Sequence, residues 1–339
     1  MGFPIHLTQL IEELYQDQQA AVKIEGELSE WFEVQSGVRQ GCTLSPYLFN
    51  IYSENIMRNV REDPNNTKYH ALNIGGFEIP ELRYADDTVL LSNDIKGLEQ
   101  LIKNTKKHSE AQNLYLNVQK TKIMSTDTTT QQPKIIIDNT EIECVDKFQY
   151  LGANINGAGN CMAEIRKRLA MASCKITQLK NIWKNNKIET KLLLLRTFIF
   201  PVATYGCETW TLNKTATKNI NAFEMKCYRK ILRISWKEKM KNSAILNILK
   251  LEEGWLLNTI GKRKLRLFGH IKRHNCLERQ IMEGRAPGKR NRGRPRRRWT
   301  DDIRDYMNTT LEKASRIAQD RERFREFIEK TTFWREYVT

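Results

Sequence analysis

Two adjacent aspartates, Asp86 and Asp87, are the side chains of this sequence best suited to hold a divalent metal ion. Hard cations such as Mg²⁺ prefer carboxylate oxygens and usually bind one or two of them together with substrate phosphates. The pair lies between Leu82 and the apolar run Val89-Leu90-Leu91, which predicts two short strands joined by a tight turn. Considered alone, an Asp-Asp turn is more often solvated than metal-binding. The surrounding motifs therefore decide between these roles.

A glycine-rich stretch, Gly37-Val38-Arg39-Gln40-Gly41, precedes the aspartates. Its two glycines allow the backbone to approach a ligand closely, and Arg39 and Gln40 can reach a phosphate or the edge of a base. Ser45-Pro46 is a typical helix start, so the following helix would direct its N-terminus at an anion. Alone, this stretch would more often be an ordinary loop.

Four motifs in a fixed order make the sequence resemble the palm of a reverse transcriptase. They are the glycine-rich loop leading into a helix, the box Tyr84-Ala85-Asp86-Asp87, the segment 116–124 with Lys120-Thr121-Lys122, and Phe148-Gln149-Tyr150-Leu151-Gly152. More narrowly, the motifs are similar to those of RTE-type non-LTR (LINE) retrotransposons. The similarity continues through Tyr205-Gly206-Cys207-Glu208-Thr209-Trp210, Phe268-Gly269-His270 and residues 320–325, and so covers essentially the whole chain.

The resemblance implies an RNA-directed DNA polymerase, a nucleotidyltransferase that uses two metal ions, Mg²⁺ or Mn²⁺. It implies that Asp86 is the principal metal ligand, that Asp87 assists it, and that Lys120 protonates the pyrophosphate. The residues implied to line the nucleotide and template are Gly37, Arg39, Gln40, Gly41, Tyr84 and Ala85. Those implied to grip the primer end are Phe148, Tyr150, Leu151 and Gly152. A solvent-facing turn lysine remains an equal alternative for Lys120, and a packed hairpin aromatic for Tyr84.

One departure from the family pattern bears on activity. The polymerases that the sequence resembles complete their metal site with a third carboxylate on an earlier palm strand, whereas this sequence starts at a segment matching the helix after that strand. Asp17, Glu25 and Glu27 are poor substitutes because they are expected on a polar helix and a hairpin. We therefore expect the C-terminal part of a longer polymerase, without endonuclease, fingers or first palm carboxylate, and weak or inactive alone. The alternatives are a non-catalytic nucleic-acid-binding remnant and a misfolded pseudoprotein.

The composition agrees with nucleic acid as a partner. Fifty-six Lys and Arg residues against 40 Asp and Glu give a net charge of +16, which attracts polyphosphates and makes binding salt-dependent. The implied partners are an RNA template, a DNA primer and deoxynucleoside triphosphates. Seven cysteines without a Cys-x-x-Cys pair predict a reduced intracellular compartment, nucleus or cytoplasm, rather than secretion. The most apolar run, 192–205, contains Arg196 and Pro201 and is too short for a membrane span, so no membrane partner is expected.

The predicted fold class is α+β. Residues 1–156 are expected to form a partial right-hand polymerase palm, an antiparallel sheet with helices on one face. The expected helices are 5–22, 46–62 and 97–113, and the expected strands are 22–24 paired with 31–34, the Asp-Asp hairpin, 123–125 and 135–137. Apolar stripes that begin at Ile165 and Ile220 predict an all-α region over 157–283. The resemblance implies that this region is the thumb that holds the template–primer duplex.

Residues 284–298 are predicted to be a flexible arginine-rich arm, because they combine many basic side chains with glycine and proline and contain no acidic residue. The segment Arg292-Gly293-Arg294-Pro295 looks like an AT-hook, whose arginines enter a narrow minor groove of duplex DNA. A generic electrostatic arm or a nuclear-targeting signal is favoured over it. The arm residues expected to contact nucleic acid are Arg290, Arg292, Arg294, Arg296, Arg297 and Arg298. A C-terminal helical segment is predicted over 299–339.

A zinc site is a further possibility that the sequence raises. His270, His274 and Cys276 have zinc-like spacing, and Cys227 could supply a fourth ligand. No close cysteine pair accompanies them. Contact with nucleic acid, or a plain surface role, is therefore favoured over zinc binding.

Overall fold

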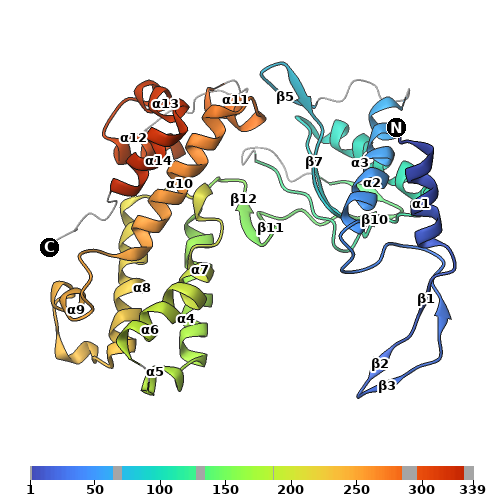
Figure 1. Cartoon of the computed structure of the whole chain (residues 1–339). Coiled ribbons are helices and arrows are strands. Elements are labelled where there is room, and N and C mark those ends of the chain that lie inside the picture. The colour runs from blue at the N-terminus through green and yellow to red at the C-terminus, as the bar shows by residue number, and fades with distance from the viewer. Residues whose placement is uncertain (1, 64–70, 127–133, 186, 285–295, 332–339) are drawn as a thin grey trace. The chain divides into compact units, whose positions relative to one another are not determined.

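A computed structural model describes residues 2–63, 71–126, 134–185, 187–284 and 296–331 (Figure 1). The chain divides into two compact units. The first consists of Met1–Tyr69, Glu81–Leu90 and Gln100–Leu116, and the second of His70–Pro80, Leu91–Glu99 and Asn117–Thr339. The predicted combination of helices with antiparallel strands is confirmed. The boundaries predicted for palm, thumb, arm and C-terminal segment remain predictions.

The first unit contains the helices that support the Asp-Asp hairpin. Its elements are α1 (Ile5–Tyr15), β1 (Gln19–Ala20), β2 (Lys23–Ile24), β3 (Glu27–Leu28), β4 (Phe32–Glu33), α2 (Ser45–Glu62), β7 (Glu81–Tyr84), β8 (Asp87–Leu90) and most of α3 (Ile95–Glu110). A small apolar core of Met57, Val60 and Leu101 joins α2 to α3, and Leu90 of β8 packs against it. Helix α2 begins at Ser45-Pro46, as predicted, because the fixed φ of proline suits the first helical turn.

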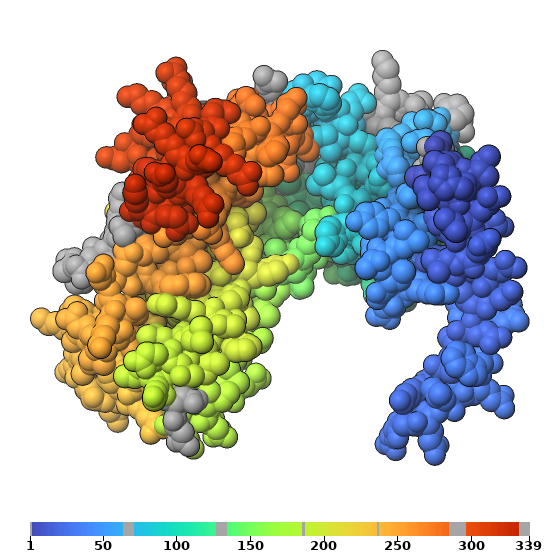
Figure 2. All heavy atoms as spheres, in the orientation of Figure 1, coloured from blue at the N-terminus to red at the C-terminus, as the bar shows by residue number. Residues whose placement is uncertain are grey.

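The predicted pairing of residues 22–24 with 31–34 is wrong. Strand β2 pairs with β3, and β1 pairs with β4. Glu25 and Gly26 both have positive φ and form a two-residue hairpin turn, so the partner of Ile24 is Glu27. Because β2 is already paired with β3, residues 32–33 of β4 pair with residues 19–20 of β1 instead. The resulting arm of β1–β4 extends away from the helices of its own unit (Figure 1 and Figure 2).

Helix α1 is shorter and more exposed than the sequence predicts. It ends at Tyr15 rather than at residue 22, because Gln16 is extended and Asp17 has a positive φ of 52°. None of its residues is buried. Ile5 and Leu10, which belong to its apolar face, are 75% and 58% exposed. The described residues therefore leave the apolar face of α1 uncovered.

The strands of the second unit form hairpins rather than one sheet. They are β5 (Leu72–Ile74), β6 (Phe77–Ile79), β9 (Ile136–Ile137), β10 (Thr140–Glu141), β11 (Lys147–Tyr150) and β12 (Ala153–Asn156). Across the described residues of both units, the strands make six separate two-stranded antiparallel sheets, so the predicted continuous sheet is wrong for this part of the chain. Each strand is only two to four residues long, and in every pair except β1 with β4 the two strands follow one another in the chain. The strand expected at 123–125 is reduced to one bridge, between Ile123 and Cys144.

Helices make up the rest of the second unit. In order they are α4 (Met162–Gln178), α5 (Ile182–Asn185), α6 (Ile188–Leu194), η1 (Leu195–Ile199), α7 (Phe200–Ala203), η2 (Cys207–Thr209), α8 (Lys214–Leu232), η3 (Trp236–Glu238), α9 (Asn242–Ile248), α10 (Trp255–Arg273), α11 (Leu277–Met282), α12 (Trp299–Met307), α13 (Leu311–Gln319) and α14 (Arg321–Lys330). Both apolar stripes predicted from the sequence are confirmed, since Ile165 and Ile176 of α4 and Ile220 and Ile231 of α8 are buried in one core.

Helix α10 is held by buried charges near its start and in its middle. The carboxylate of Glu224 on α8 accepts the N–H groups of Trp255 and Leu256 at 2.6 and 3.2 Å, capping the helix N-terminus. Burial raises the pKa of Glu224. Further along, the ammonium of Lys264 bonds the carboxylate of Asp302 on α12, and both side chains are inaccessible to solvent.

The C-terminal helices pack on α10 around this ion pair. Phe268 of α10 lies in a second buried cluster with Ile303, Phe324 and Ile328 of the C-terminal helices. Gly269 is required for the close approach of α14, because a Cβ there would lie 2.6 Å from the ring of Phe324. In the described part of residues 299–331, the chain forms the helices α12, α13 and α14.

Removing one member of the buried ion pair should destabilise the second unit more than removing both. Lys264→Met should lower the free energy of unfolding by about 3–5 kcal/mol, because it leaves Asp302 buried without its main counter-charge. Adding Asp302→Asn, which keeps an acceptor for the N–H of Leu212, should restore part of that loss. Urea unfolding of the single and double variants measures the difference, and strictly additive losses would contradict the expectation.

Candidate functional site

Asp86 and Asp87 lie at the tip of the β7–β8 hairpin, as predicted. Tyr84 pairs with Asp87, so Ala85 and Asp86 form the two-residue turn between the strands. Ala85 has a φ of 52°, a left-handed conformation that costs an alanine roughly 1 kcal/mol or more. Both carboxylates are exposed. Tyr84 is 66% exposed, which does not support the alternative of a packed aromatic at this position.

A network of charged side chains fixes this hairpin on α2. Arg83 of β7 donates to Ser53 at 3.1 Å and bonds the carboxylate of Glu54. Arg61 bonds Glu54 at 2.5 Å and also bonds Glu81 at the start of β7. The strand is thereby held at two alternate positions on one face, and the exposed aspartates extend from an anchored base.

This network was not predicted from the sequence. The sequence pattern that could have indicated the network is a pair of charged residues, Glu81 and Arg83, on one face of a strand. It is matched by Glu54 and Arg61, which lie two helical turns apart on α2. Partial burial opposes the charged form of Glu54, but hydrogen bonds from Arg61 and Arg83 outweigh it and lower the pKa of that carboxyl.

The glycine-rich loop is bonded to α1. Gly37 and Gly41 have φ angles of 98° and 82°, which glycine adopts far more readily than other residues. The guanidinium of Arg39 donates to the carbonyl of Leu14 at 2.9 Å and lies 5.8 Å from the centre of the Tyr15 ring. Arg39 is therefore engaged at the C-terminal end of α1, where helix carbonyls favour a cation. Gln40 is exposed.

A second anchored turn lies between β11 and β12, where the primer grip is predicted. Leu151 and Gly152 both have positive φ and form the turn. The hydroxyl of Tyr205 donates to the carbonyl of Leu151 at 2.8 Å, and Arg168 bonds the carbonyl of Gly152. The Arg168 guanidinium also lies 4.3 Å from the centre of the Tyr205 ring.

A buried carboxylate on α4 completes this anchor. Glu164 accepts from Arg168 at 2.6 Å and from the N–H of Asn154 in β12 at 2.9 Å. Phe148 and Tyr150 are half-buried, and Leu151 is exposed. Arg168 is buried and holds the turn.

Lys120 lies on a turn of the second unit. Its backbone N–H donates to the carbonyl and the side-chain oxygen of Asn117 at 3.2 and 3.1 Å. Its side chain is exposed, so the turn leaves the ammonium accessible to solvent. The general-acid role expected for Lys120 stays a prediction.

The described part of the predicted arginine arm is tied to α12. Arg297 forms ion pairs with Asp302 and Asp305 at 2.7 and 2.6 Å. The N–H of Arg298 donates to Asp301 at 2.7 Å at the helix start, and Arg296 bonds the carbonyl of Ala158. Arg297 is therefore not a free arm residue, because two carboxylates of α12 hold it. The other predicted arm residues, Arg290, Arg292 and Arg294, lie outside the described residues.

The donor chemistry at the Asp-Asp tip fits a hard cation. Two exposed carboxylates supply oxygen ligands, and Mg²⁺ commonly takes only one or two from protein when substrate phosphates complete its coordination. Among the described residues, no three or more His, Cys, Asp or Glu side chains gather as a metal-binding group. Asp17, Glu25 and Glu27 thus add no third ligand there.

The residues considered as zinc ligands also do not form a metal-binding group among the described residues. The rings of His270 and His274 lie 4.3 Å apart, centre to centre. Cys227 is fully buried, and burial raises the pKa of its thiol to about 12. The thiolate that would bind zinc is therefore disfavoured at Cys227.

The described helices include none that combines the length and hydropathy of a membrane span.

Comparison with known proteins identifies the segment that holds the Asp-Asp hairpin. Residues 1–155 match the family of reverse transcriptases (RNA-dependent DNA polymerases). Residues 1–155 carry a reverse transcriptase domain. The domain contains the glycine-rich loop, both aspartates, Lys120 and the β11–β12 turn.

Three relatives of the chain are named as proteins of transposable elements. It is 26% identical over 279 residues to an uncharacterized transposon-derived protein of Caenorhabditis elegans, covering 77% of the chain and 99% of that protein. It is 23% identical over 299 residues to the RNA-directed DNA polymerase of the transposon X-element of Drosophila melanogaster, covering 85% of the chain and 31% of that protein. It is 25% identical over 173 residues to a Pol polyprotein of the retrotransposable element R2 of Nasonia vitripennis, covering 48% of the chain and 16% of that protein.

The reverse transcriptase domain is of the non-LTR retrotransposon type. The chain spans a third or less of the length of the two polymerases, and nearly all of the nematode protein.

The network at the base of the Asp-Asp hairpin should make stability depend on pH. Because the folded-state pKa of Glu54 lies below its ordinary value of 4.5, its contribution is present above about pH 4.5 and is lost as the pH falls through the lower folded-state value. Glu54→Gln should therefore cost about 1 kcal/mol at pH 7, the range for exposed ion pairs, and less than this at pH 3.

Urea unfolding at both pH values measures the loss. Glu62→Gln, a change of an exposed glutamate on the same helix, is the matched control. An equal loss at both pH values would contradict the role given to the Glu54 carboxylate.

Proposed function

We propose that the reverse transcriptase domain of this chain extends a DNA primer on an RNA template. The observation that carries the proposal is the exposed Asp86-Asp87 pair on an anchored hairpin inside the matched domain. Asp86 would be the main ligand of Mg²⁺ or Mn²⁺, and Asp87 would assist. When bound, the metal would neutralise phosphate charge and make the primer hydroxyl more acidic.

The remaining roles follow from where the residues lie. The exposed loop at Gly37–Gly41 and the hairpin residues Tyr84 and Ala85 would contact the nucleotide and template. Lys120, whose side chain is exposed, would give a proton to the leaving pyrophosphate. The turn at Leu151 and Gly152 would hold the primer end, since its backbone is fixed by Arg168 and Tyr205.

We further propose an RTE-type lineage, with residues 1–156 as a partial palm and 157–283 as the thumb. The support is the order of motifs from the glycine-rich loop to Asp320–Arg325. Because only two carboxylates come together at the hairpin among the described residues, we propose that polymerase activity of this chain alone is weak.

Asp86→Asn should abolish Mg²⁺-dependent primer extension on an RNA template. We expect a loss of at least about 100-fold, the effect of removing one electrostatic contact to a developing charge. Asp146→Asn, which makes the same charge change at an exposed position, should leave extension unchanged. Extension that is insensitive to Asp86→Asn would refute the catalytic role of the hairpin.

The alternative function is nucleic-acid binding without chemistry. Two observations favour this alternative. Among the described residues, only two carboxylates come together at the hairpin, and the net charge is +16. In the same experiment, it predicts no extension by either the unaltered chain or the variant, while both bind the template–primer duplex.

A further inference from the structure

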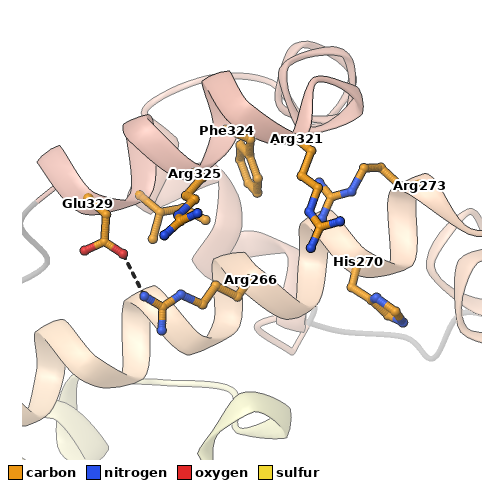
Figure 3. Close-up of a pocket in the computed structure, with 8 residues that line it drawn as sticks. Arg266, His270, Arg273, Arg321, Phe324, Arg325 and Glu329 are labelled. Carbon is orange, nitrogen blue, oxygen red and sulfur yellow. Dashed lines mark hydrogen bonds and ion pairs between the residues drawn. The ribbon is translucent and has the colours of Figure 1, made fainter.

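A strongly basic pocket lies between α10 and α14 in the second unit, outside the matched reverse transcriptase domain (Figure 3). Its volume is 450 Å³, in the range of pockets that hold one small ligand or one segment of a chain. The basic side chains that line it are Arg266, His270, Arg273, Arg321 and Arg325. Helix α10 supplies the first three, and α14 supplies the last two.

The charge of this pocket is not balanced. Its carboxylate, Glu329, is already bonded to Arg266 at 2.7 Å and to Lys262 at 3.3 Å. In the part of the chain that the structure describes, no carboxylate forms an ion pair with Arg273, Arg321 or Arg325. Burial lowers the pKa of Arg273, and the like charge of Arg321 lowers it further. An anion in the pocket would relieve this repulsion.

The pocket is held in shape by its surroundings. The guanidinium of Arg273 donates to the carbonyl of Ala318 at 2.7 Å, which fixes that end of the side chain. Phe324 and Ile328 line the pocket from α14 and are otherwise buried in the core. Gly269 lets the Phe324 ring pack directly on α10. Arg266 and Arg273 are therefore held by hydrogen bonds before any ligand arrives.

The arrangement of charges suits a linear polyanion better than a single phosphate. Arg266, His270 and Arg273 follow one another at spacings of four and three residues, which spans about 10.5 Å along α10. Arg321 and Arg325 lie one turn apart on α14, and Figure 3 shows basic side chains of both helices around the space between them. Guanidinium groups match phosphate oxygens in pairs of parallel hydrogen bonds. Two neighbouring backbone phosphates could be bound at once.

We propose that this pocket binds successive backbone phosphates of a single nucleic-acid strand. The site does not involve the Asp-Asp hairpin, so it would act whether or not the chain polymerises. Recognition by phosphates alone carries no base preference. The pocket would thus bind a nucleic-acid strand independently of its base sequence.

The test is the binding of a fluorescein-labelled 12-nucleotide oligouridylate to the full chain, followed by fluorescence anisotropy at several salt concentrations. Arg321→Gln with Arg325→Gln removes two exposed arginines of the pocket. Arg316→Gln with Arg323→Gln, which changes two exposed arginines of α13 and α14 outside it, is the control of equal charge. Thermal unfolding of both double variants checks that each remains folded.

The pocket variant should bind about 10-fold more weakly, and its salt slope should fall by about 1.4, because each phosphate contact on a single strand contributes about 0.7. In the control variant, both the affinity and the salt slope should stay close to those of the unaltered chain. Equal losses in the two variants, or no loss in either, would overturn the proposal. Competition by uridine triphosphate as effective as that by unlabelled oligouridylate would overturn the assignment to a strand. Binding should persist in Asp86→Asn, so failure here and failure of the proposed polymerase are separate results.

Discussion

The buried ion pair between Lys264 and Asp302 is the contact on which the C-terminal half of the second unit depends. Taking two charges out of water costs several kcal/mol for each ion, so the pair is tolerable only with further hydrogen bonds. Those bonds come from different elements: the carbonyl of Trp210, the N–H of Leu212 and the guanidinium of Arg297. One charged centre thereby fixes α10, α12 and the segment after η2 with respect to one another. Burial acts to lower the pKa of Lys264, and Asp302 opposes that effect.

The two turns predicted to contact substrates are anchored in the same way. In each, an arginine and a glutamate join a hairpin to a helix: Arg83 with Glu54 at the base of the Asp-Asp hairpin, and Arg168 with Glu164 at the β11–β12 turn itself. Functional groups held to within a fraction of an ångström need such supporting contacts. The exposed tips can therefore meet a substrate without losing their geometry.

Features with a local cause could be predicted from the sequence. The Asp-Asp hairpin follows from alternating residues around one turn, and the α4 and α8 stripes follow from helical periodicity that reaches the core at Ile165 and Ile220. Features that depend on distant partners could not. The pairing of β1 with β4 is set by the turn at Glu25, and Arg297 belongs to α12 because of carboxylates that no local pattern indicates.

The ion pair also affects how the chain is held together along its length. Lys264 and Asp302 are 38 residues apart, and the segment between them includes residues 285–295. The helices after this segment are packed on α10 through Phe268, Phe324 and Ile328 as well as through the charges. A single peptide-bond cleavage between α11 and α12 would therefore leave the C-terminal helices bound, and the two fragments would separate only in denaturant.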